Sequence, residues 1–154
     1  MHLSALTLII PDLRGYGASS KPETTPDHAP YAKRAMAQDM AYLMTHFGHE
    51  QFAVLAHDRG ARVAHRLGLD HARRVSKLML LDIAPTREMY ANTTDAFARA
   101  YWHWFFLVQD APFPEDMINA DPAAYVHKKC GAWSAGASPI AAEAMDHYIA
   151  AFRN

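Results

Sequence analysis

The sequence has few of the features that mark several protein classes. Its 154 residues include one cysteine, Cys130, so no internal disulfide can form, and we expect a protein of the reducing cytoplasm. The formal net charge is −1 without a basic stripe, which argues against nucleic acid as a partner. The apolar residues 1–10 lack a basic n-region and a cleavage site, and they are too few to span a membrane.

Metal-ligand patterns are also missing, although the sequence contains ten histidines. No HExxH motif occurs, and Cys130 has no second cysteine with which to share a metal ion. His46 and His49 flank the end of an expected helix, where histidine is commonly a favourable cation or a surface residue. We therefore expect no metal site.

Apolar periodicity predicts alternating strands and helices in the first half of the chain. The apolar-rich runs Leu6–Ile10, Phe52–Ala56 and Lys77–Leu81 predict three strands buried in a parallel sheet. Helical spacing between them predicts helices over Lys33–Phe47 and from Arg59 to about His71. This order predicts an α/β fold with crossover helices and with functional sites at the carboxyl ends of the strands.

The sequence changes character after Pro85, where no further strand-like run occurs. We divide the chain into a core, residues 1–85, and a helical layer, residues 86–154, expected to lie over the sheet. Aromatic residues at helical spacing predict one helix over Met89–Gln109 that is apolar nearly all round. Later prolines predict further short helices, with Asp121 and Ser138 as N-caps directly before two of them.

The most informative segment is Phe52–Arg62, FAVLAHDRGAR. Asp58 stands between the small residues Ala56 and Gly60 where a strand is expected to pass directly into a helix. This is the pattern of a nucleophile elbow, a tight turn in which a side chain at Gly60 would clash, with Asp in place of the usual Ser. A carboxylate there suggests attack on an alkyl carbon, because the resulting ester can be hydrolysed. The alternative is a plain helix cap, since Asp is common at strand ends.

Other side chains with suitable chemistry lie near this segment or downstream of it. Arg59 and Arg62 are three positions apart and can share the helix face beside Asp58, although a solvated face is the alternative. Downstream, Tyr101-Trp102-His103-Trp104 gathers rings with N–H or O–H donors; Trp104 also fits a plain core position, whereas His103 lies off the aromatic stripe.

These segments resemble the haloacetate (fluoroacetate) dehalogenases of the α/β-hydrolase superfamily. The combination of HDRGAR and YWHW is the specific part of the likeness, because PDLRGYG is shared with epoxide hydrolases. The matching segments are PDLRGYGASSKP (Pro11–Pro22), RAMAQDM (Arg34–Met40), AHDRGARVAHRLGLDH (Ala56–His71), LLDIAPT (Leu80–Thr86) and AYWHWFFL (Ala100–Leu107).

The resemblance implies a role for most of the candidate residues. Asp58 would displace the halide in an SN2 step and become an ester, which water cleaves to a 2-hydroxy acid without any cofactor. Arg59 and Arg62 would hold the carboxylate of a small anionic haloacid, since guanidinium forks match that group. His103 and Trp104 would donate hydrogen bonds to the departing halide.

The resemblance also implies that this chain is an internal fragment, a partial α/β-hydrolase core with an incomplete helical cap. Asp82 would orient the catalytic histidine, although on the residues alone a turn-forming role fits it equally well. Of the histidines after Asp82, His103 matches the halide motif and none matches the general base, which is therefore expected to be missing. Unpaired sheet edges predict association of chains, for example as a homodimer.

Two other functions stay open at this point. One is an epoxide hydrolase or haloalkane dehalogenase relative with neutral substrates, which the two arginines beside Asp58 argue against because they require an anionic partner. The other is a non-catalytic, truncated hydrolase-like domain that binds carboxylates, which the missing general base favours.

Overall fold

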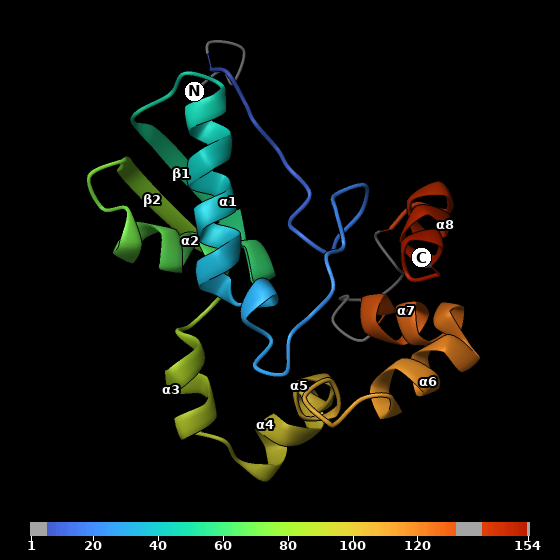
Figure 1. The fold of residues 1–154 in the computed structure, drawn as a ribbon. Coiled ribbons are helices and arrows are strands. Elements are labelled where there is room, and N and C mark those ends of the chain that lie inside the picture. The colour runs from blue at the N-terminus through green and yellow to red at the C-terminus, as the bar shows by residue number, and fades with distance from the viewer. Residues whose placement is uncertain (1–5, 132–139, 154) are drawn as a thin grey trace. The chain divides into compact units, whose positions relative to one another are not determined.

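The computed structural model describes residues 6–131 and 140–153. Its contacts divide the chain into two compact units, Met1–Ala91 and Asn92–Asn154. The first unit combines strands and helices, and the second is helical (Figure 1). We expected the change of character after residue 85; the contacts group residues 86–91 with the first unit.

The first unit contains a short parallel sheet with helices before, between and after its strands. Two of the three expected strands are confirmed, and they pair in parallel with Val54 opposite Leu78 and His57 opposite Leu81. The elements are η2 (Ala29–Tyr31), α1 (Lys33–His46), β1 (Phe52–His57), α2 (Asp58–Asp70), β2 (Val75–Leu81) and α3 (Thr86–Ala91).

The expected strand at Leu6–Ile10 is wrong. This segment has no strand conformation, and the side chains of Leu8 and Ile10 are 56% and 88% exposed. An apolar run becomes a strand only where a neighbouring strand supplies backbone hydrogen bonds. The sheet of the described residues consists of β1 and β2, and this segment pairs with neither of them.

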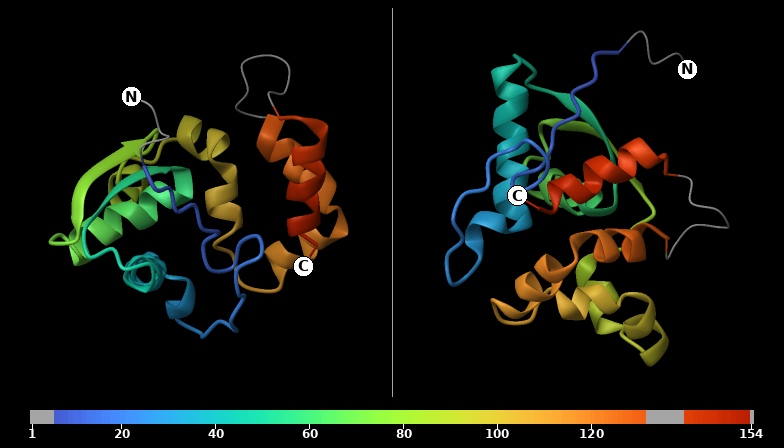
Figure 2. Two further views of the ribbon diagram at one scale, coloured as in Figure 1. Left: turned by 90° about the horizontal axis from the view of Figure 1, so that it is seen from above. Right: turned by 90° about the vertical axis from the view of Figure 1, so that its right-hand side faces the viewer.

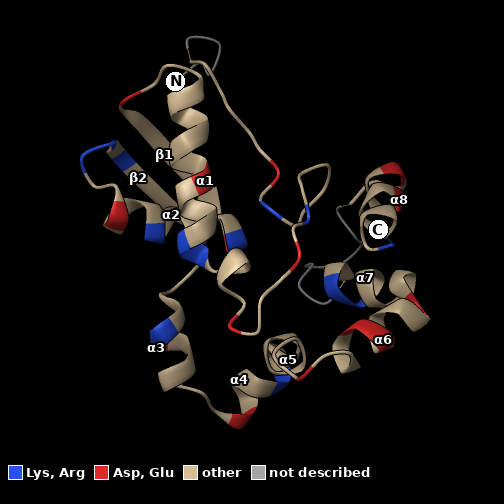
Figure 3. Cartoon of the chain, in the orientation of Figure 1, with Lys and Arg blue, Asp and Glu red and all other residues tan. Residues whose placement is uncertain are grey.

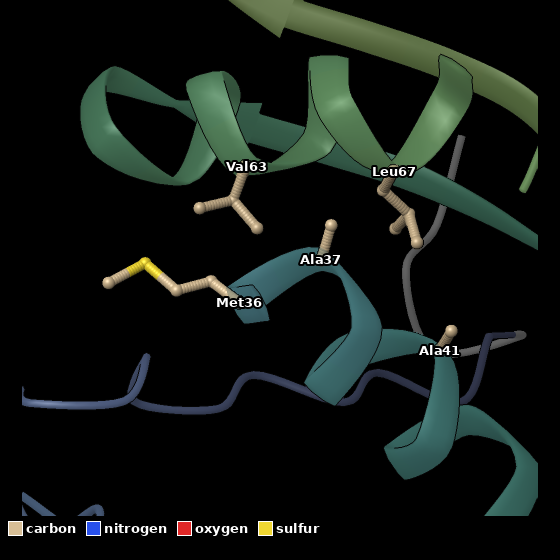
Figure 4. Close-up of a cluster of buried hydrophobic side chains, with 5 residues drawn as sticks. All are labelled: Met36, Ala37, Ala41, Val63 and Leu67. Atoms are coloured by element: carbon tan, nitrogen blue, oxygen red, sulfur yellow. The ribbon is translucent and has the colours of Figure 1, made fainter. Parts of the chain in front are cut away.

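The core of the first unit lies between α1 and α2. Met36, Ala37 and Ala41 of α1 face Val63 and Leu67 of α2, and all five side chains are at most 3% exposed (Figure 4). The alanines of α1 let the two helices approach closely, so the larger side chains of α2 fill the space between them. This contact fixes the direction of α2, and therefore the position of its first residues.

The other side of α2 packs on the sheet. A Cβ built on Gly68 would lie 3.1 Å from Cδ2 of Leu78 in β2, which is tighter than ordinary van der Waals contact. The small packing face expected on this helix is confirmed, because Ala61 and Ala64 are also buried. Strand β2 and helix α1 thus hold α2 from two sides.

Strand β1 passes into α2 without an intervening loop, as the elbow pattern predicts. His57 ends the strand, and Asp58 opens the helix with φ of 44°, in the left-handed region. An L-residue in this region costs about 1–2 kcal/mol, somewhat less for Asp. A Cβ at Gly60 would meet no other part of the described chain within 4 Å, so crowding of Gly60 by neighbouring elements is not observed.

The long helix expected over Met89–Gln109 is wrong, because three short helices occupy this stretch. They are α3, α4 (Asp95–Ala100) and α5 (Trp102–Phe106). The hydroxyl of Thr94 accepts a hydrogen bond from the backbone N–H of Phe97 at 3.1 Å and so starts α4 afresh. Threonine and asparagine compete for backbone hydrogen bonds in this way, and they interrupt an apolar period that would otherwise continue.

The remaining described helices are α6 (Phe113–Ala120), α7 (Pro122–Gly131) and α8 (Ala142–Ala151), drawn from two further sides in Figure 2. The expected N-cap at Asp121 is confirmed, since its carboxylate accepts the backbone N–H of Ala124 at 2.9 Å. The other expected cap, Ser138, lies outside the described residues. Among residues 6–131 and 140–153, no helix has both the length and the apolar character needed to cross a membrane.

The α1–α2 contact predicts a large effect of truncating Leu67. Leu67→Ala should lower the free energy of unfolding by about 2–4 kcal/mol, because a buried cavity replaces the lost methyl groups. Leu69→Ala on the same helix is the matched control, since Leu69 is 63% exposed and its loss should cost under about 0.5 kcal/mol. Urea unfolding followed by circular dichroism measures both, and equal losses would contradict this core.

The left-handed backbone at Asp58 predicts an inversion of the usual preference for alanine over glycine. Asp58→Gly should be more stable than Asp58→Ala by about 1 kcal/mol, because glycine adopts this conformation without a Cβ penalty. At the next position, Arg59→Gly should instead be less stable than Arg59→Ala by about 0.5–1 kcal/mol, since its backbone is ordinary helix. Thermal unfolding measures the difference in stability between the Gly and Ala variants at each position. The same sign of this difference at both positions would exclude a strained turn at Asp58.

Candidate active site

Two carboxylates follow neighbouring strands at the same edge of the sheet. His57 and Leu81 are partners at the end of the parallel ladder, so Asp58 and Asp82, which directly follow the two strands, lie at its carboxyl end. Both are exposed, and both have positive φ, 44° and 51°. The carboxyl ends of parallel strands are where sites of α/β proteins form, so the structure brings these two candidates to one edge.

Asp12, which lies shortly after the segment Leu6–Ile10, has a structural role. Its carboxylate accepts the backbone N–H of Ala18 at 3.0 Å, and its carbonyl accepts the hydroxyl of Ser19 at 2.7 Å. A side chain at Gly17 would collide with this carboxylate. Asp12 therefore closes its own loop.

The guanidinium of Arg62 is held by the segment that follows β2. Its Nη1 donates to Oγ1 of Thr86 at 2.8 Å and to the carbonyl of Ala84 at 3.2 Å, and its Nη2 lies 3.3 Å from the sulfur of Met89. Arg62 is half-buried, so the solvated helix face that the sequence left open does not describe it, whereas Arg59 is exposed. These contacts fix the plane of the guanidinium against the segment that follows β2.

Positive charge accumulates around the start of α2. Burial lowers the pKa of Lys33, the first residue of α1, and the nearby charges of Arg59 and Arg62 lower it further, whereas Asp58 acts in the opposite direction. Basic positions at the start of α1 and along α2 appear in blue in Figure 3. Lys33 thus interacts with two arginines and with one carboxylate, an arrangement that favours an anionic partner.

A pocket of about 230 Å³ lies on the first unit beside this cluster. Neither Asp58 nor Asp82 is among its lining residues, so the pocket borders the carboxylate edge through Arg62 without containing the candidate nucleophile. The lining residues are Lys33, Arg62, His65, Arg66, Leu69, Ile83, Ala84, Pro85, Thr86 and Arg87.

The candidate halide donors, His103 and Trp104, belong to the second unit and begin α5 together with Trp102. His103 is 6% exposed, and its Nδ1 lies 3.0 Å from Nζ of Lys129 in α7. Trp104 is half-buried against Phe97, with ring centroids 6.1 Å apart and nearly perpendicular. Trp104 therefore has the core contacts of an aromatic stripe, whereas His103 is a buried polar group with a charged neighbour.

Sequence reasoning missed three residues of these surroundings: Lys33, Thr86 and Lys129. Each contacts or interacts with a candidate residue more than twenty positions away along the chain. No periodicity or motif spacing signals such a contact. In the part of the chain that the structure describes, no three His, Cys, Asp or Glu side chains are grouped as metal ligands.

Comparisons with known proteins identify relatives of this chain. A fluoroacetate dehalogenase of Burkholderia sp. is 46% identical over 149 residues, which are 96% of this chain and 49% of that protein. A soluble epoxide hydrolase of Corynebacterium sp. (strain C12) is 42% identical over 79 residues, 51% of this chain and 26% of that protein. A solved structure of a candidate α/β hydrolase from Nostoc sp. PCC 7120 has a TM-score of 0.89 and 52% identity, covering 93% of this chain and 49% of the other.

The chain spans about half the length of the dehalogenase and of the Nostoc protein. The model of the α/β hydrolase fold family matches residues 2–142, which is most of the sequence. The family match is consistent with the turn at Asp58 and with the parallel strands. The chain belongs to the α/β hydrolase fold family.

Proposed function

We propose that this chain carries the nucleophile and substrate-binding residues of a haloacetate dehalogenase, an enzyme that converts a fluoroacetate-like acid into a 2-hydroxy acid and halide. The observation that carries the proposal is the carboxylate of Asp58, presented on a left-handed turn in reach of the charges of Lys33, Arg59 and Arg62. The likeness to the Burkholderia fluoroacetate dehalogenase supports the choice of substrate class.

In the first step, a carboxylate oxygen of Asp58 attacks the carbon that bears the halogen. The carbon–halogen bond breaks, halide leaves with the bonding electron pair, and Asp58 becomes an ester of the substrate. In the second step, water attacks the carbonyl of the ester, which releases the 2-hydroxy acid and a proton and restores the carboxylate. Both steps balance without a cofactor.

The cations would offset the electrostatic repulsion between the substrate and the attacking carboxylate. A haloacetate is itself an anion, so it is repelled by the carboxylate that must attack it. Arg59 and Arg62 would bind the substrate carboxylate, and Lys33 adds positive charge to the same region. Because Thr86 and Ala84 fix the guanidinium of Arg62, less side-chain freedom is lost when the substrate binds.

His103 and Trp104 are the proposed donors to the departing halide. Imidazole and indole N–H groups can both donate a hydrogen bond, and Trp104 can only donate. Fluoride is a poor leaving group, so donors at the position where its charge develops lower the barrier. Asp82 is proposed to orient the histidine that acts as the general base.

An epoxide hydrolase activity is the second candidate, because the Corynebacterium relative carries that name. An epoxide is neutral, however, and does not need three cations beside the nucleophile.

A chain that binds acetate or glycolate but never reacts with a haloacetate would indicate the third candidate, a non-catalytic carboxylate-binding domain.

Covalent trapping tests the nucleophile. After incubation with fluoroacetate or chloroacetate, intact mass spectrometry should show one carboxymethyl group per chain, and peptide mapping should place it on Asp58. Quenching the reaction before water cleaves the ester keeps the adduct on the protein. Asp58→Asn should show no adduct. Absence of the adduct from wild-type protein that unfolds cooperatively would contradict the proposal, and an adduct from an epoxide alone would favour the second candidate.

A second prediction concerns the geometry of Arg62. Arg62→Lys should reduce the apparent affinity for the haloacetate about tenfold in the trapping reaction, because lysine loses the planar fork that matches a carboxylate. Arg66→Lys is the matched control: Arg66 lies one turn further along α2 and binds Asp70 through two nitrogens. Equal effects of the two substitutions would show that only general positive charge matters.

A further inference from the structure

A buried histidine and a lysine form a polar pair inside the second unit. His103 of α5 is 6% exposed, and its Nδ1 lies 3.0 Å from Nζ of Lys129, 26 positions further along the chain in α7. Lys129 is half-buried, and its neighbour Lys128 is exposed. The contact is not an ion pair of opposite charges, because histidine and lysine are both bases.

The chemistry of the two groups fixes the direction of this hydrogen bond. A lysine ammonium carries three hydrogens and no lone pair, so it can only donate. Nδ1 of His103 must therefore accept, which means that it carries no hydrogen. A neutral imidazole with a bare Nδ1 has its hydrogen on Nε2. A doubly protonated ring would point the N–H at Nδ1 toward the ammonium. Two donors would then face each other without an acceptor, so this form is disfavoured.

We infer that Lys129 is a positioning residue that holds His103 as the neutral tautomer with its hydrogen on Nε2. This inference rests on the proposed function for its use, since a halide needs a donor at a fixed place. Without Lys129, either ring nitrogen can carry the hydrogen, and part of the population loses the donor at Nε2. The structure thereby assigns the donating atom of His103.

Neighbouring aromatic rings restrict rotation of the His103 imidazole. The ring of Tyr101 lies nearly parallel to it, at an interplanar angle of 25° with centroids 6.1 Å apart, and Trp102 lies across it at 77° and 6.0 Å. Packed rings resist a flip of the imidazole, so the choice of protonated nitrogen cannot be compensated by a simple rotation. Lys129 selects the tautomer, and the aromatic contacts keep its orientation.

The tautomer is read directly from the ¹⁵N resonances of the histidine ring, with His103→Gln used for assignment. In the wild-type chain, Nε2 of His103 should be protonated and Nδ1 bare. Lys129→Met should give a mixture of tautomers, whereas Lys129→Arg should retain the wild-type spectrum because guanidinium also only donates. Lys128→Met is the matched control on the same helix and should leave the spectrum unchanged. A protonated Nδ1 in the wild type, or no change in Lys129→Met, would overturn the inference.

The rate of adduct formation on Asp58 tests the link to the halide. Lys129→Met should slow the reaction with fluoroacetate about tenfold and the reaction with chloroacetate less, because fluoride depends more on a hydrogen-bond donor as it leaves. The two readouts separate the failures: an altered tautomer with no adduct in any variant rejects the proposed function alone. An altered tautomer with unchanged adduct rates rejects the halide role of this pair.

Discussion

The structure of the first unit depends on the turn that joins β1 to α2. Asp58 occupies a left-handed backbone conformation at the point where the strand becomes a helix, which costs free energy for any residue with a Cβ. The turn persists because the helix behind it is held from two sides. Val63 and Leu67 pack on α1, and Gly68 lets the helix lie directly on β2. Packing at some distance from the carboxylate therefore keeps it at the edge of the sheet.

The same packing concentrates positive charge. Since α1 must lie against α2 to bury the core, its first residue, Lys33, comes within range of the arginines that begin α2. Burial already disfavours the charged form of Lys33, and the two arginines disfavour it further. Asp58 offsets part of the repulsion. A bound anion would offset more of it, and this supports the proposal of an acid, rather than a neutral epoxide, as the substrate.

Local patterns were sufficient to predict α1, β1, α2 and β2, because apolar period and glycine position determine these elements over a few residues. Gly48 ends α1 with φ of 77°, and the backbone N–H of His49 bonds the carbonyl of Met44 at 2.8 Å. The segment Leu6–Ile10 was wrong because a strand depends on a partner elsewhere in the chain. The single helix over Met89–Gln109 was wrong because aromatic spacing continues across a capping threonine that interrupts the backbone.

The candidate site shows the same division between local and distant information. Asp58, Arg59 and Arg62 are close in sequence, so a motif could name them, and the chain's membership of the α/β hydrolase fold family agrees with that motif. Thr86 and Lys129 act through side chains brought together only by folding, and each controls a property that the motif does not encode. Thr86 sets the orientation of a guanidinium, and Lys129 sets which nitrogen of an imidazole carries the hydrogen. The motif thus names the proposed reacting groups, while contacts between distant elements within each unit decide the atoms through which those groups would act.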